Sequence, residues 1–285
     1  DFQNALTTAQ SNGKNDVIRL EQGTYLLSEN NGEQFTYRST EPWSLIILGG
    51  YSTGCTQRDA NPANTILDGQ AIDQGSEFGG GLLHIRDGDT DLISSHTEIT
   101  IDGITVQNGK ATYAGGVNAY KQYGAVNFTD NILQNNTATY GGGIYVMAHS
   151  GSLTLANNVI SENTAYHYAG VFAQPTYGKM HFTNNTVTEN SGNIVNGNGG
   201  GLYIYQLGDD SSAELYNNIF WNNTAKNGAQ IYLDKLQGQE VTAYNNVLDL
   251  ADVFGTLTAE GDNFNTDPLL TGGGDYHLTP GSPCV

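Results

Sequence analysis

Lys179 and His181 stand two residues apart in a stretch that alternates apolar and polar residues. Because successive side chains of a β-strand point to opposite faces, these two would share a face. β-Elimination on a uronic acid sugar needs a base for the C5 proton and a cation to neutralise the carboxylate. Lys179 could bind the carboxylate, and His181, or His167 between two tyrosines, could take the proton. A solitary Lys or His on a turn is also an ordinary surface residue, so the pair leaves both interpretations open.

The charge balance argues against such an enzyme. The chain has 29 acidic and 10 basic residues, a net charge of −19, and would repel an anionic polymer. All the arginines (Arg19, Arg38, Arg58 and Arg86) precede the regular repeats. A hydrolase needs two carboxyl groups converging on one bond, whereas Asp209 and Asp210 are adjacent in an irregular segment where we expect a loop. We therefore expect a non-catalytic protein, with a polysaccharide lyase or glycoside hydrolase as the alternative.

A third candidate is a cation site in an acidic stretch. Asp87, Asp89 and Asp91 alternate with other residues, and Glu98 falls at the twelfth position, where an EF-hand has its bidentate glutamate. An EF-hand is excluded because Leu92 replaces the turn glycine and no flanking helices are expected. A looser Ca²⁺ site and a solvated acidic loop remain as the two interpretations. No other cofactor is expected.

The composition excludes several classes of protein. A pI near 4.3 argues against binding nucleic acid or an anionic membrane, since both need a basic surface. No apolar run reaches the length of about 18 residues that a membrane-spanning helix requires. Cys55 and Cys284 are the only cysteines, and they could form a disulfide or be unrelated. The chain begins at Asp1 without a leader, so we expect a mature or trimmed product.

A repeat between about residues 99 and 250 determines where these side chains stand. One column recurs at steps of 27, 27, 27, 33 and 28 residues: Gly103, Asp130, Asn157, Asn184, Asn217 and Asn245. The next column holds Ile104, Asn131, Asn158, Asn185, Asn218 and Asn246, and a third holds Gly109, Asn136, Asn163, Asn190 and Asn223. Fixed periods of this length are typical of repeat architectures.

The pattern inside each unit is that of β-strands. Apolar residues alternate with polar ones at a spacing of two, as in Val126/Phe128 and Leu153/Leu155. No helical stretch separates the strands, so each unit must be a coil of short strands stacked on its neighbours, a parallel β-helix. We predict that the stacked Asn side chains hydrogen-bond along the axis. Gly and Asn tolerate the left-handed backbone of tight corners.

The chain is predicted to be one all-β domain. Residues 1–30 form an N-terminal cap and first strand, with Phe2, Ala5, Leu6 and Ala9 on one face of a short capping helix. Residues 31–98 form irregular early coils and residues 99–250 regular coils. The repeat is lost from about residue 252, so residues 251–285 are expected to cap the far end, because a β-helix must protect its open edges.

Aromatic residues recur at outward positions of one strand. The two outward columns include Tyr120, Tyr145, Phe172, Tyr203, Tyr205 and Tyr232, with neighbours about 4.8 Å apart along a column. Exposed aromatic ladders suit stacking on sugar rings or packing on a partner. The alternatives are that the rings stabilise the sheet through cross-strand contacts, or that a loop or another chain covers them.

The repeat motifs resemble those of bacterial surface proteins. Phe220-Trp221-Asn222-Asn223 matches the Phe-x-x-Asn motif of polymorphic outer-membrane-protein repeats, and Gly142-Gly143-Ile144 is close to their Gly-Gly-Ala-Ile motif. Gly274-Asp275-Tyr276-His277-Leu278 and the residues after it resemble the end of choice-of-anchor surface proteins. The resemblance implies a right-handed parallel β-helix of the pectate-lyase-like superfamily, exported to the cell surface or outside the cell. That architecture hosts enzymes and adhesins alike.

Together these observations favour an exported, non-catalytic structural or adhesion module. It would bind glycan or another surface protein through the outward aromatic face, with no nucleic acid partner and no membrane span. Because the end of a β-helix is a template for another coil, the chain could also assemble end to end. Cys55 near one end and Cys284 at the other could then pair between subunits.

Overall fold

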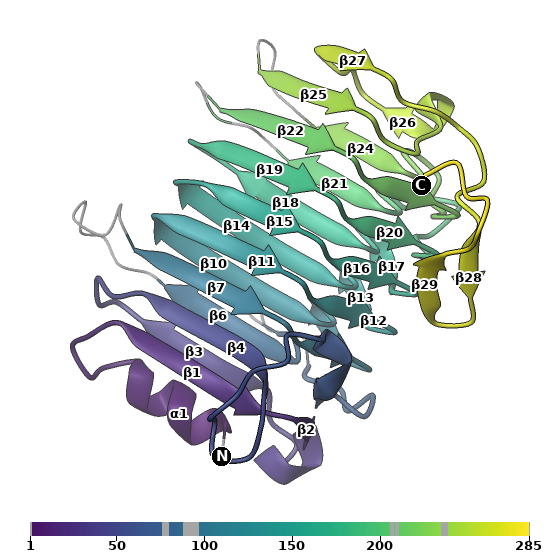
Figure 1. Ribbon diagram of the computed structural model, residues 1–285. Coiled ribbons are helices and arrows are strands. Elements are labelled where there is room, and N and C mark those ends of the chain that lie inside the picture. Colours follow the sequence, from purple (N-terminus) through teal and green to yellow (C-terminus); the bar gives the residue numbers. More distant parts are fainter. Residues whose placement is uncertain are drawn as a thin grey trace.

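The computed structural model describes residues 2–75, 80–87, 97–205, 208, 211–234 and 239–284. Short strands wind around one axis, and each coil stacks on the coil before it, from the N-terminal end to the C-terminal end (Figure 1). Strands at equivalent positions of successive coils pair in parallel, for example Val126 of one coil opposite Leu153 of the next. The described chain is therefore a parallel β-helix, as the repeat predicted.

Three long sheets form its walls. The nine-stranded sheet runs in the order β1 (Asp16–Glu21), β4 (Leu45–Tyr51), β7 (Glu98–Asp102), β11 (Ala125–Thr129), β15 (Leu153–Ala156), β19 (Lys179–Thr183), β22 (Ser212–Tyr216), β25 (Glu240–Tyr244) and β27 (Ala259–Gly261). The eight-stranded sheet contains β3 (Phe35–Ser39), β6 (Leu83–Asp87), β10 (Val117–Tyr123), β14 (Ile144–Ser150), β18 (Val171–Pro175), β21 (Leu202–Tyr205), β24 (Ile231–Asp234) and β26 (Val253–Phe254).

The third wall and the turns complete each coil. The seven-stranded sheet contains β2 (Gly23–Leu26), β5 (Thr65–Asp68), β8 (Thr105–Gln107), β12 (Ile132–Gln134), β16 (Val159–Ser161), β20 (Thr186–Thr188) and β23 (Ile219–Trp221). A short sheet of β9 (Lys110–Tyr113), β13 (Thr137–Tyr140) and β17 (Thr164–His167) lies before the eight-stranded wall in chain order. Three 3₁₀ turns are described: η1 (Leu27–Asn30), η2 (Pro62–Asn64) and η4 (Leu250–Asp252). The early coils, irregular in sequence, join the same sheets as the regular ones.

The interior is filled by the inward residues of all three walls. On the nine-stranded sheet one inward column is almost fully excluded from solvent: Ile99, Val126, Leu153, Met180, Ala213 and Val241. Burial of these apolar side chains is the main favourable term in folding. Because the register never slips between regular coils, the same face of every strand reaches the core.

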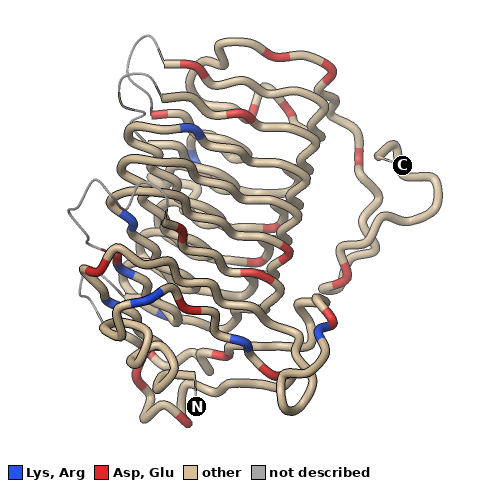
Figure 2. The backbone as a smooth tube through the Cα atoms, turned by 60° about the vertical axis from the view of Figure 1, so that its left-hand side comes forward, with Lys and Arg blue, Asp and Glu red and all other residues tan. Residues whose placement is uncertain are grey.

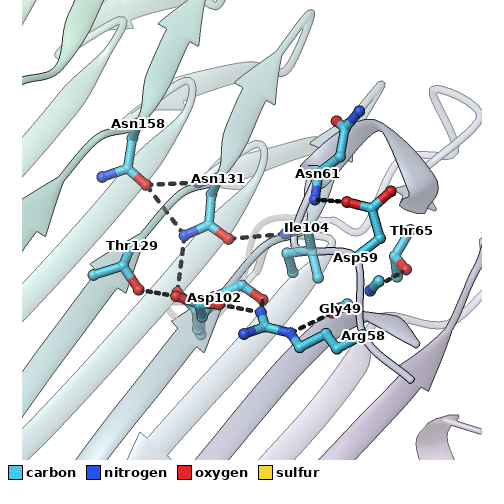
Figure 3. A network of polar contacts seen from close by, with 12 residues as sticks. Gly49, Arg58, Asp59, Asn61, Thr65, Asp102, Ile104, Thr129, Asn131 and Asn158 are labelled. Carbon is cyan, nitrogen blue, oxygen red and sulfur yellow. Dashed lines mark hydrogen bonds and ion pairs between the residues drawn. The ribbon is translucent and has the colours of Figure 1, made fainter. Parts of the chain in front are cut away.

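The adjacent Asn columns have two different roles. The first column lies at the left-handed corners, with φ between 54° and 69° from Gly103 to Asn245, where Asn and Gly carry the least strain. The second column is buried and forms a ladder: the side-chain N–H of Asn131 donates to Oδ1 of Asn158 at 3.1 Å, and Asn158 donates to Asn185 at 3.0 Å. Figure 3 shows its start, where Ile104 N–H donates to Asn131.

A second buried ladder runs through Asn136, Asn163, Asn190 and Asn223, with side-chain N···O distances of 2.9 Å between rungs. In both ladders each amide also donates to a backbone carbonyl of an earlier strand, as Asn136 does to Val106 at 3.0 Å. Buried amides are costly unless they are paired, so these ladders turn a polar interior column into a stabilising one. The predicted Asn stacking is confirmed.

Helix α1 (Phe2–Ala9) protects the N-terminal edge, as predicted. Its Phe2, Leu6 and Ala9 are buried. The Gln3 side chain donates to the Thr36 carbonyl at 3.0 Å and accepts from the Thr36 N–H at 2.8 Å, while Gln10 accepts from the Arg38 N–H at 3.0 Å. These amides satisfy backbone groups of β3, the edge strand of the eight-stranded sheet. An uncovered edge strand would be a template for pairing with another strand.

The C-terminal segment has two parts. Strands β26 and β27 continue the stack and pair in parallel with the coil before them. After them, β28 (Leu270–Gly272) and β29 (Asp275–Leu278) form an antiparallel hairpin. The hairpin lies against the side of the β-helix, not across its end (Figures 1 and 2). Tyr276 anchors it there by donating to the Glu162 carboxylate at 2.9 Å. The expected C-terminal cap therefore covers the flank.

Candidate functional site

The outward aromatic residues of the eight-stranded sheet form one stacked column. Tyr145, Phe172, Tyr203, Tyr232 and Phe254 are direct partners in the strand register. Their ring centroids are 4.1, 5.7, 4.7 and 4.4 Å apart in that order, with interplanar angles between 5° and 18°. Each ring inside the column therefore uses both faces on its neighbours.

The first three rings of the column are covered, whereas Phe254 at its end is 46% exposed. Tyr145, Phe172 and Tyr203 are only 9, 4 and 4% exposed. Tyr168, in the turn before β18, lies 4.2 Å from Tyr203, and Tyr113 of β9 meets Tyr145 edge-on at 6.4 Å. Tyr168 and Tyr113 thus cover these three rings, whose area stabilises the sheet through cross-strand contact.

Burial also changes the chemistry of these phenols. It raises the pKa of Tyr145 to about 12. Burial likewise raises the pKa of Tyr203, and the hydrogen bond that its hydroxyl donates to Asp234 at 2.9 Å raises it further, since it stabilises the neutral phenol beside a carboxylate. Both groups are therefore neutral donors and not bases at physiological pH.

The remaining predicted aromatic residues are half-buried. Tyr120 lies under the Arg86 guanidinium, which is 5.5 Å from the ring centroid, a cation–π contact. Tyr205 lies 6.0 Å from Phe172 and Tyr232 lies 4.7 Å from Tyr203. These three rings keep partial exposure, and of them Tyr205 packs against the buried rings of the column.

Lys179 and His181 do share the outer face of the nine-stranded sheet, where both alternate with inward residues of β19. His181 Nδ1 lies 3.2 Å from a carboxylate oxygen of Glu214 on the next strand, and both side chains are close to half exposed. Glu214 lies 33 residues on, which is one repeat step, so the alignment of the coils places it next to His181 in the same outward column. A carboxylate beside an imidazole orients the ring.

His167 lies elsewhere. It ends β17 in the three-stranded sheet, stacks on Tyr140 at 5.7 Å and accepts a hydrogen bond from the Asn198 N–H at 3.2 Å. Burial lowers the pKa of His167. The structure therefore does not bring His167 together with Lys179 and His181.

Of the residues expected to bind calcium, Asp87 and Glu98 are described, and Asp89 and Asp91 lie outside the described residues. Asp87 is 2% exposed and forms an ion pair with the Lys121 ammonium inside the β-helix. Lys121 also donates to Thr97 at 2.9 Å. Glu98 accepts from Asn127 at 3.2 Å. In the described ranges no three His, Cys, Asp or Glu side chains gather as metal ligands would, and the calcium loop stays a prediction.

Lys121 is a residue that sequence reasoning missed. It occupies an inward position of β10, two residues after Ala119 and four after Val117. A lysine in the apolar phase of a strand was the available signal, since a buried lysine requires a partner.

Neither cysteine is paired within the described chain. Cys55 lies in the turn after β4, where its sulfur is 3.7 Å from the Arg19 carbonyl oxygen. Cys284 lies after the C-terminal hairpin and lines a surface hollow with Asn217 and Leu278. Pairing between subunits remains a prediction.

The comparisons with known proteins agree with this geometry. The family model of the right handed beta helix region matches residues 63–266, more than half of the 285 residues, and the chain belongs to this family. The fold is thus an all-β, single-domain, right-handed parallel β-helix with a short N-terminal helix. No curated protein and no solved structure matched the chain. None of the described helices has the length and apolar character needed to cross a membrane.

Proposed function

We propose that this chain is an exported, non-catalytic β-helix module that serves adhesion or structure at a cell surface or outside the cell, binding glycan or another protein chain. One observation carries this proposal: the side chains that could have done chemistry mostly serve the stack itself. The aromatic rings use their faces on one another, the Asn amides donate along the ladders, and Asp87 pairs with Lys121. A β-helix of this kind would hold its outer surfaces apart and present them to binding partners.

The test combines product release with retention. The full chain is incubated with a panel of neutral and acidic polysaccharides, with and without Ca²⁺, and is then passed over the same polymers immobilised. We expect retention on at least one polymer with no new reducing ends and no unsaturated sugars. Product formation would overturn the non-catalytic proposal, and loss of retention on every polymer would overturn the glycan-binding part.

One observation favours the alternative, a polysaccharide lyase or hydrolase. His181 is positioned by Glu214 at 3.2 Å on an open sheet face that also carries Lys179, an arrangement suited to a general base next to a cation. If products form, His181→Ala should abolish them, whereas His149→Ala, on the eight-stranded sheet, should leave them unchanged.

The second partner we propose is another copy of this chain. Gln3 and Gln10 occupy the backbone groups of the N-terminal edge strand β3, so contact through the opposite end, at β26 and β27, is favoured. Sedimentation with and without reductant tests this. A mass that stays monomeric at every concentration would reject it, and a reductant-sensitive dimer would support pairing of Cys55 or Cys284 between subunits.

A further inference from the structure

The coil that contains β25 and β26 is shorter than the coil before it. The chain runs twelve positions from Ile219 to Ile231, but only six from Val247 to Val253, although Val247 pairs with Ile219 and Val253 with Ile231. The omitted positions are those that build the corner after the seven-stranded sheet in the preceding coil. Residues 222–229 of this corner therefore have no equivalent residues stacked on their C-terminal side.

A hollow of about 490 Å³ lies at this uncovered corner. Trp221, Asn222, Gln230, Asp249, Asp252 and Asn265 contribute to its lining. Its size falls within the range of about 300–1,000 Å³ in which ligand pockets lie. Its lining combines two aromatic residues, Phe220 and Trp221, with side-chain amides and carboxylates, and it includes no Lys or Arg.

Trp221 differs from the other aromatic residues of the β-helix. It ends β23, is half-buried, and stands beside the buried Thr188 of the preceding coil. Unlike Tyr203 and Tyr232, it stacks on no other ring in the described part of the chain. An indole that lines a hollow and has no stacking partner is suited to the C–H face of a sugar ring.

The polar side chains at the hollow are already held in place. Asp249 accepts the Ala251 N–H with Oδ1 at 2.9 Å and the Asn265 side-chain N–H with Oδ2 at 2.6 Å. Each carboxylate oxygen can accept more than one hydrogen bond, and the Asn265 amide has a second N–H and a carbonyl oxygen. A fixed carboxylate and amide would bind hydroxyl groups with little loss of side-chain entropy.

The charge of the hollow selects among ligands. Asp249 and Asp252 would repel a uronate, and no basic side chain of the lining compensates. We propose that this hollow binds an uncharged sugar unit of a glycan, with Trp221 stacking on the ring and Asp249, Asp252 and Asn265 binding its hydroxyls. This inference rests on the proposed function and locates its ligand site away from the aromatic column.

The two tryptophans allow a direct test. In Trp43→Phe, Trp221 is the only indole, and titration with maltohexaose, mannohexaose or xylohexaose should change its fluorescence with saturation. Oligogalacturonate and spermine serve as the anionic and cationic probes. Calorimetry on Trp221→Phe and Asp252→Asn should show affinity for the neutral probe reduced at least tenfold, while thermal unfolding checks that both variants remain folded.

The outcomes separate this inference from the proposed function. If none of the neutral probes changes Trp221 fluorescence or releases heat, or if spermine binds in their place, the sugar site is rejected. If the unaltered chain is retained on a polysaccharide and Trp221→Phe and Asp252→Asn are retained equally, the adhesion function stands and only this site is wrong. Retention of the unaltered chain on no polysaccharide contradicts the glycan-binding part of the proposed function itself.

Discussion

Gln230 Oε1 accepts a hydrogen bond from the Asn223 side-chain amide at 2.7 Å. Asn223 is the last rung of its ladder, and Gln230 supplies the acceptor that the next Asn supplies in every earlier rung. Gly143, Gly170 and Gly201 occupy the equivalent position of earlier coils, where an added Cβ would lie 3.0–3.2 Å from the amide nitrogen of the following Asn. A side chain is allowed at position 230 because the ladder ends there.

The first prediction concerns this ladder end. Gln230→Ala should lower the free energy of unfolding by about 1–3 kcal/mol, because one N–H of the buried Asn223 amide loses its acceptor. Denaturant unfolding at neutral pH measures the change. Gln57→Ala, at an exposed turn position, is the control and should stay within about 0.5 kcal/mol. Equal stability of the two variants would contradict the capping role.

The second prediction concerns the glycine of an internal rung. An alanine Cβ at position 143 would lie 2.7 Å from the Gly170 carbonyl oxygen and 3.0 Å from the Asn163 side-chain nitrogen. Because a backbone carbonyl of the next coil cannot move independently, Gly143→Ala should destabilise by about 3 kcal/mol or more. Gly32→Ala has open space and only a positive φ of 74°, so it should cost about 1–2 kcal/mol. Thermal unfolding of both variants tests whether Gly143→Ala lowers the stability more than Gly32→Ala does.

The period of the Asn and Gly columns was enough to predict the coils and the ladders, and the apolar face of Phe2, Leu6 and Ala9 predicted the capping helix. A fixed repeat places equivalent residues at equivalent positions, so one alignment determines nearly every contact between regular coils. The sequence did not separate the corner column at Asn184 from the ladder column at Asn185, because both are Asn. Backbone φ distinguishes them: only the first has a positive φ.

The candidate site was less predictable, because it depends on what covers each outward position. Strand alternation placed Tyr145, Phe172 and Tyr203 on the outside of the sheet correctly. It could not show that Tyr113, at the end of β9, and Tyr168, in the turn before β18, cover these rings. Likewise Asp87 looked like the start of an acidic loop, and only its distance to Lys121, 34 residues on, shows that its carboxylate lies inside.

The third prediction concerns that interior ion pair. Lys121→Met removes one charge and leaves the buried Asp87 carboxylate without its partner, which should cost about 3–5 kcal/mol. The double variant Lys121→Met with Asp87→Leu should recover most of that loss, because it also removes the second charge from the interior. Urea unfolding of Lys121→Met, Asp87→Leu and the double variant completes a double-mutant cycle. A double variant as unstable as the sum of the single variants would show that the two residues act independently.

The fourth prediction concerns alkaline pH. Burial raises the pKa of Tyr145 in the folded chain to about 12, whereas a free tyrosine, like one in the unfolded chain, has a pKa of 10.0. Between these two values the folded chain keeps a proton that the unfolded chain releases. The resulting stabilisation is complete below pH 10 and is lost progressively as the pH rises toward 12. Tyr145→Phe, which places in this column the residue already present at Phe172, should reduce the steepness of that decline by about one proton. Urea unfolding between pH 8 and 12 measures it, with the exposed Tyr177→Phe as the control. If Tyr145→Phe declines as steeply as Tyr177→Phe, Tyr145 is not one of the phenols that link stability to pH.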